Sequence, residues 1–115
     1  ANSSGTELLD QAATDLRLAI DLLPDSWSDA DKGRVTRNSA RGMLAKVLVF
    51  KGTVNNNTAD FTEAISVING MSGVSLTPNF NDNFDAEKEN NSESLFTAGS
   101  LNSFICFFIN FKVSE

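Results

Sequence analysis

The chain has 115 residues, 41% of them hydrophobic, which is enough for one globular domain and no more. Its 15 acidic and 9 basic residues give a formal charge of −6, which excludes the basic surface that nucleic-acid binding needs. There is no His and only one Cys, so the commonest general base and metal ligand are missing and no internal disulfide can form. We therefore expect a protein that is not an enzyme and holds no metal or other cofactor.

Residues 7–23 are predicted to form the first helix. Thr6 precedes this segment as a candidate N-cap, and Pro24 prevents the helix from continuing. The apolar side chains recur at helical spacing and form one continuous stripe, with charged residues on the other side. This stripe consists of Leu9, Ala12, Ala13, Leu16, Ala19, Ile20 and Leu23.

A polar loop then leads into a second predicted helix over residues 37–51. Thr36 is placed to cap its N-terminus, and Gly52 is expected to end it in the left-handed conformation. Two amphipathic helices joined by a short loop form an antiparallel hairpin, which is the unit of helical repeat proteins. The stripe expected to pack in this helix comprises Ala40, Met43, Leu44, Val47 and Leu48.

The rest of the chain is predicted to be less regular after a third helix over residues 59–68. That helix has a narrower stripe, made of Phe61, Ala64, Ile65 and Ile68. A long loop over 71–92 leads to a short strand near 93–98, and the apolar run 104–111 reads as a buried strand. The predicted fold is mainly α, with a tetratricopeptide-like helical hairpin, a third helix, a long loop and one or two short strands. Residues 1–98 form part of a helical-repeat domain, and 99–115 are an apolar tail of uncertain structure.

Trp27 is the candidate ligand-binding residue. An exposed indole stacks well on apolar faces such as those of a sugar ring, but an aromatic beside a helix end also commonly plugs the bottom of a hairpin. The sequence favours the structural role and leaves the ligand role open. The role of Cys106, inside the apolar tail, also stays open, with a buried and inert thiol as the simpler interpretation.

Two charged segments resemble ion-binding sites, but other residues in or near each segment argue against that function. Asn81, Asn83 and Asp85 alternate as in a calcium loop, but Ala86 and Ser92 stand where that loop needs Gly and Glu. The basic residues beside the second helix could bind an anion, but nearby acidic residues make mutual neutralisation the more economical account. The basic residues are Lys32, Arg34, Arg37 and Arg41, and the acidic ones are Asp25, Asp29 and Asp31.

Four segments, taken in order, resemble the SusD/RagB family of outer-membrane nutrient-uptake lipoproteins of Bacteroidetes. They are AIDLLPDSW, DKGRVTRNSARGMLAKVLVFKG, DFTEAISVING and SLTPNFNDNFDAEKENNSESLF, and the resemblance as a whole covers about Leu9 to Phe96. The resemblance stops after about Ala98 and covers the helical-repeat portion alone.

This resemblance implies a non-enzymatic binding component of a glycan uptake system at the cell surface. Such proteins are anchored in the outer membrane by a lipid and cap a TonB-dependent, SusC-like transporter. They bind an oligosaccharide, here through parts of the parent protein outside this chain, and this chain supplies part of the helical scaffold. The alternative is a generic tetratricopeptide-like protein-interaction module without a sugar ligand.

Overall fold

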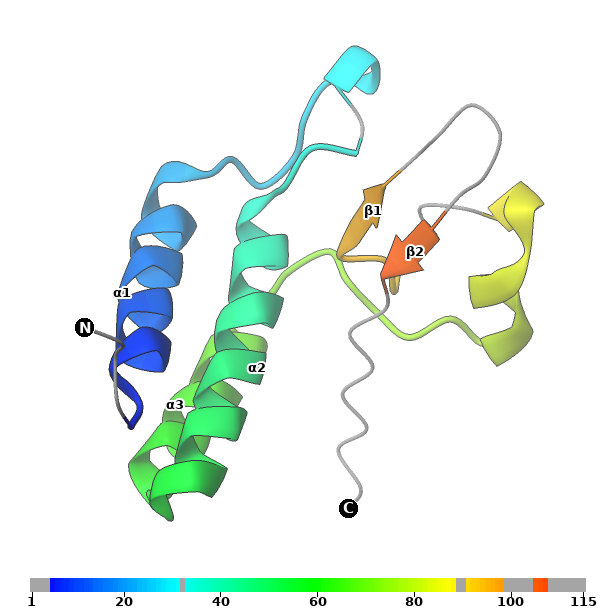
Figure 1. Cartoon of the computed structure of the whole chain (residues 1–115). Helices are drawn as coiled ribbons and strands as arrows, with labels where there is room; N and C mark the ends of the chain where they lie inside the picture. Colours follow the sequence, from blue (N-terminus) through cyan, green and yellow to red (C-terminus); the bar gives the residue numbers. More distant parts are fainter. Residues whose placement is uncertain (1–4, 32, 89–90, 99–104, 108–115) are drawn as a thin grey trace.

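The computed structural model describes residues 5–31, 33–88, 91–98 and 105–107. It is mainly α, as the sequence predicts, and its three long helices are α1 (Glu7–Leu22), α2 (Arg37–Asn55) and α3 (Thr58–Asn69). Helix α2 packs against both α1 and α3. Figure 1 shows the three helices side by side in one part of the molecule, and the irregular segment that follows them in the other.

Besides these helices, the described residues form three short 3-10 turns and two three-residue strands. Turn η1 (Asp29–Asp31) lies in the loop between α1 and α2, whereas η2 (Phe80–Phe84) and η3 (Ala86–Lys88) follow α3. Strands β1 (Phe96–Ala98) and β2 (Ile105–Phe107) pair antiparallel, with Phe96 opposite Phe107 and Ala98 opposite Ile105. The rest of the predicted apolar tail, over 99–104 and 108–115, lies outside the described residues.

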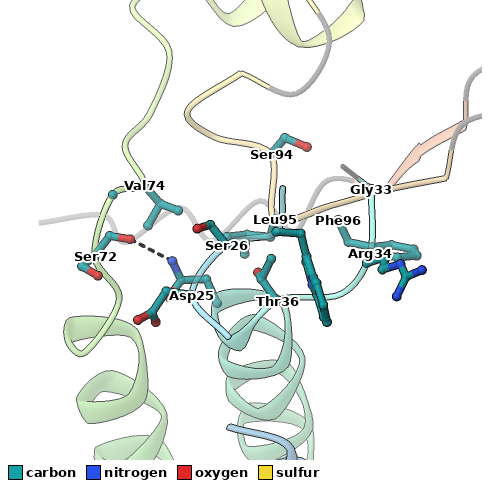
Figure 2. Close-up of a pocket in the computed structure, with 13 residues that line it drawn as sticks. Asp25, Ser26, Gly33, Arg34, Thr36, Ser72, Val74, Ser94, Leu95 and Phe96 are labelled. Carbon is teal, nitrogen blue, oxygen red and sulfur yellow. Dashed lines mark hydrogen bonds between the residues drawn. The ribbon is translucent and has the colours of Figure 1, made fainter. Parts of the chain in front are cut away.

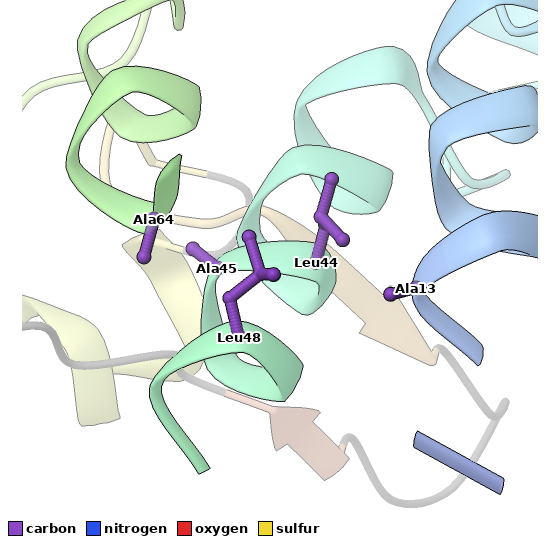
Figure 3. Close-up of a cluster of buried hydrophobic side chains, with 5 residues drawn as sticks. All are labelled: Ala13, Leu44, Ala45, Leu48 and Ala64. Atoms are coloured by element: carbon purple, nitrogen blue, oxygen red, sulfur yellow. The ribbon is translucent and has the colours of Figure 1, made fainter. Parts of the chain in front are cut away.

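Small side chains make up most of the buried core between the helices. Ala13 of α1 and Ala64 of α3 meet α2 at positions where α2 presents Leu44, Ala45 and Leu48 (Figure 3). Alanines at the contacts let the helix axes approach closely, and the two leucines fill the space that remains. The partly buried residues around this cluster are Leu16, Ile20, Val47, Val67 and Ile68.

The predicted stripe of α1 agrees with the structure. All seven of its members are buried or half-buried, while Asp10, Asp15, Arg17 and Asp21 are exposed. In α2 and α3 one member of each predicted stripe was wrong. Met43 is 47% exposed and Ile65 is 61% exposed, because Ala45 and Val67 occupy the positions that face the core.

Two of the predicted helix ends also need correction. Gly52 does not end α2, which continues to Asn55 and is capped by Asn56 in the left-handed conformation at φ 50°. Gly52 is instead a buried packing residue, since a Cβ there would lie 3.1 Å from the Asn57 carbonyl oxygen and from the Phe61 ring. Thr6 stands at the N-cap of α1, but its hydroxyl bonds the Asp10 carboxylate and caps no backbone N–H.

Candidate functional site

The N-terminus of α2 carries the predicted Thr36 cap, which is one half of a reciprocal capping box with Ser39. The Thr36 hydroxyl accepts a hydrogen bond from the backbone N–H of Ser39 at 3.3 Å, and the Ser39 hydroxyl accepts one from the N–H of Thr36 at 3.1 Å. This reciprocal box satisfies two backbone donors that the first turn of a helix would otherwise leave without partners. It also fixes the path of the chain where the loop enters α2.

Arg37 joins this helix start to the end of α1. Its Nε donates to the carbonyl of Ile20 at 3.0 Å, and its terminal nitrogen binds both carboxylate oxygens of Asp25 at 3.0 and 3.1 Å. Arg34 likewise pairs with Asp31 at 2.9 Å. The mutual neutralisation predicted for the basic run is thus confirmed for these two arginines, while Lys32 lies outside the described residues.

Two buried polar side chains in the first turn of α2 hold distant segments in place. The Asn38 amide donates to the carbonyl of Ser72 at 2.8 Å, and the Ser39 hydroxyl donates to the carbonyl of Leu95. Sequence reasoning did not identify either residue as an anchor. The available signal was the placement of Asn and Ser two and three residues after the cap, within a helix start that buries its first turn.

These anchors create a groove of about 520 Å³ above the N-terminus of α2. We call it the Trp27 groove. Figure 2 shows its three walls, which are the loop before α2, the segment after α3 and the segment that leads into β1. The lining residues are Asp25, Ser26, Trp27, Gly33, Arg34, Thr36, Asn38, Ser72, Gly73, Val74, Ser94, Leu95 and Phe96.

Trp27 occupies the rim of this groove. Its indole N–H donates to the carbonyl of Val35 at 2.8 Å, and the guanidinium carbon of Arg34 lies 5.3 Å from the ring centroid. The side chain remains 36% exposed. The hydrogen bond and the cation–π contact hold the ring in one orientation, so Trp27 braces its own loop and still presents part of its ring to solvent.

The loop after α3 is organised around one carboxylate. Oε2 of Glu93 accepts hydrogen bonds from the backbone N–H and hydroxyl of Thr77, both at 3.1 Å, and from the amide of Asn83 at 3.0 Å. The Asn83 amide, followed by the Thr77 donors, holds the pKa of Glu93 below its ordinary value, because these bonds favour the charged form.

The polar side chains in the segment that resembled a calcium loop thus form hydrogen bonds and an ion pair within the loop itself. Asn83 binds Glu93 and Asn91, Asp85 accepts from the N–H of Glu87, and Asp82 pairs with Lys88. Within the described ranges, no group of three His, Cys, Asp or Glu side chains is arranged to hold a metal ion. No helix in the same part of the chain is long and apolar enough to cross a bilayer.

The chain is similar to a SusD-like protein of Bacteroides ovatus. The two are 38% identical over 88 aligned residues, which cover 70% of this chain and 16% of the relative. The chain therefore spans less than a fifth of the length of the protein it matches. No model of a protein family and no solved structure matches the chain. The resemblance to SusD-like proteins predicted from the four segments is thus confirmed, for a part of such a protein.

Proposed function

We propose that this chain is part of the helical scaffold of a non-enzymatic binding component of an outer-membrane glycan uptake system. The protein is a surface-exposed lipoprotein that caps a SusC-like, TonB-dependent transporter, and its main oligosaccharide site lies outside this chain. The observation that carries the proposal is the 38% identity to a SusD-like protein over most of the chain. The mainly α structure, with α2 packed between α1 and α3, is consistent with the predicted tetratricopeptide-like arrangement.

An affinity tag on the protein in its native cells provides the test. After mild detergent extraction of the outer membrane, we expect a TonB-dependent transporter to co-purify in near-equal amount. The tagged protein should also be digested when protease is added to intact cells. An unrelated tagged outer-membrane lipoprotein is the matched control, because it shares the location but should not retain the transporter. Protection from protease in intact cells would overturn the proposal.

One observation favours the alternative of a tetratricopeptide-like module that binds a protein and no sugar. Met43, Phe50 and Val54 of α2 are spaced by seven and four residues and are 47%, 61% and 57% exposed. Such spacing places them along one face of the helix, where an apolar partner surface can pack. If the tagged protein retains a soluble protein partner and no transporter, this alternative replaces the first proposal.

A further inference from the structure

We propose that the Trp27 groove is a subsite for a neutral oligosaccharide. The inference rests on the proposed function and extends it, because it places a sugar contact within this chain. The Trp27 groove has a volume of about 520 Å³, which lies within the range of roughly 300–1,000 Å³ that is usual for small-molecule sites. The argument depends on which polar groups of the groove are already occupied and which remain available.

The charges at the groove are compensated within the protein. Arg37 pairs with Asp25, and Arg34 pairs with Asp31. A phosphate or carboxylate ligand would gain little net attraction, because a carboxylate already neutralises each guanidinium charge, and a cationic ligand would gain as little from the paired carboxylates. A ligand that carries hydroxyl groups and no charge meets neither obstacle.

The internal hydrogen bonds leave a specific set of polar groups for such a ligand. Asn38 and Thr36 are engaged in anchoring and capping. The hydroxyls of Ser26 and Ser72 are exposed and form no hydrogen bond within the described part of the chain. Arg34 has five N–H donors on a side chain that is 62% exposed, so it retains donors beyond those directed at Asp31.

Trp27 supplies the apolar surface that sugar recognition needs. Its N–H is already bonded to Val35, so the indole contributes ring surface rather than a donor. The contact with Arg34 and the bond to Val35 fix the ring before a ligand arrives, which lowers the entropy lost on binding. A groove that combines this fixed aromatic ring with the Arg34 guanidinium and the Ser26 and Ser72 side chains in its lining matches the alternating C–H and O–H surfaces of a pyranose.

The composition of the chain makes this site directly observable. Trp27 is the only Trp and there is no Tyr, so tryptophan fluorescence of the 115-residue chain reports on this groove alone. We expect cellohexaose, maltohexaose, xylohexaose or mannohexaose to produce a saturable change in this fluorescence. Isothermal titration calorimetry of the same chain should give the same dissociation constant. If none of the four sugars gives a saturable change in either measurement, the inference is wrong.

Matched variants then separate the groove from the rest of the surface. Trp27→Ala should weaken binding about tenfold, as expected for loss of one aromatic contact, whereas Phe50→Ala removes an exposed aromatic on α2 and should leave it unchanged. The double variant Ser26→Ala and Ser72→Ala provides a second test that does not depend on Trp27. It should weaken binding several-fold without altering the circular dichroism spectrum, because neither hydroxyl forms a bond within the described part of the chain.

The outcomes distinguish this inference from the proposed function. Sugar binding that both groove variants leave intact would overturn the subsite, while transporter co-purification would still support the proposed function. If a sugar binds in the groove but no transporter co-purifies, the subsite is supported and the proposed function is overturned. Saturable binding of an extended peptide, with no response to any sugar, would assign the groove to a different ligand and overturn the inference.

Discussion

The buried hydroxyl of Ser39 on α2 donates a hydrogen bond to the carbonyl of Leu95, which lies 56 residues further along the chain. The same oxygen accepts from the backbone N–H of Thr36 in the capping box. One serine therefore both begins α2 and positions the segment that enters β1. This dual use explains why a polar residue that is only 7% exposed stands in the first turn of the helix.

Ser39→Ala should destabilise the fold by about 1–3 kcal/mol. The substitution leaves the carbonyl of Leu95 and the N–H of Thr36 without their partner, and an unsatisfied buried polar group costs about that much. Urea denaturation followed by circular dichroism measures the change in the free energy of unfolding. Ser66→Ala, at an exposed position of α3, is the control and should change stability by less than about 0.5 kcal/mol. Equal effects of the two substitutions would contradict the anchoring role of Ser39.

A second set of contacts ties the two outer helices together through α2. Lys51 binds Asp10 of α1 at 2.8 Å and Asp60 of α3 at 3.4 Å, and Asp60 is only 6% exposed. The hydrogen bond with Asp10 raises the pKa of Lys51 and lowers the pKa of Asp10. Arg17 of α1 and Glu63 of α3 add a bidentate pair at 2.8 and 2.9 Å.

Lys51→Met should therefore destabilise the three-helix unit. The variant leaves the Asp60 carboxylate buried with Asn57 as its remaining partner among the described residues, so we expect a loss between the ~1 kcal/mol of an exposed pair and the ~3 kcal/mol of a buried one. Because the pKa of Lys51 is raised in the folded state, its contribution is complete below the ordinary value of 10.5 and is lost as the pH rises through the folded value. Lys46→Met, at an exposed position of α2, should have little effect in the same urea titration. A similar loss for both variants would argue against the bridge.

The sequence alone was sufficient to predict helices that bury a regular apolar stripe. It was insufficient where a residue distant in the sequence determines whether a position is buried or where a helix ends. The stripe of α1 follows a 3.6-residue period, so its buried face could be predicted. Gly52 was expected to end α2 because glycine commonly follows a helix, but the contacts that decide its role come from Asn57 and Phe61. Met43 of α2 and Ile65 of α3 were wrongly predicted to be buried for the same reason, because contacts with the neighbouring helix decide which side of each helix faces the core.

In the candidate site, too, some residues could be identified from the sequence and others could not. Trp27 was identified because an isolated aromatic in a polar loop is conspicuous, and Thr36 because its position before the helix predicts a cap. Asn38 and Ser39 were missed, since their partners are backbone carbonyls 34 and 56 residues away. Carbonyls carry no side-chain signature in a sequence, so this kind of anchor is visible only once the chain is folded.

Gly52→Ala should destabilise the protein even though alanine is the better helix former. The gain in helix propensity is about 1 kcal/mol, but the new Cβ would lie 3.1 Å from the carbonyl oxygen of Asn57 and from the ring of Phe61. Asn57 caps α3 with its side chain, so its backbone has little freedom to move, and overpacking of this kind costs about 1–3 kcal/mol. Gly70→Ala is the matched control, because its nearest neighbour is the carbonyl oxygen of Val67 at 3.4 Å. Thermal unfolding should show a lower Tm for the first variant and an equal or higher Tm for the second. A higher Tm for Gly52→Ala would show that the packing is looser than described.

Glu93→Gln should loosen the loop after α3 in a pH-dependent way. The charged Glu93 accepts three hydrogen bonds and its pKa is lowered in the folded state, so its contribution is present above the ordinary value of 4.5 and is lost as the pH falls through the folded value. At neutral pH the variant should therefore exchange the amide hydrogen of Thr77 faster than the native protein, once the intrinsic rates are taken into account. The difference should shrink as the pH falls through the lowered pKa of Glu93, which lies below 4.5, because the native side chain then becomes neutral like that of the variant. Glu87→Gln, at an exposed position of the same loop, should leave the exchange of this amide unchanged at every pH. If the native protein and Glu93→Gln instead differ by the same factor across the whole range, the loop is held by contacts other than this carboxylate.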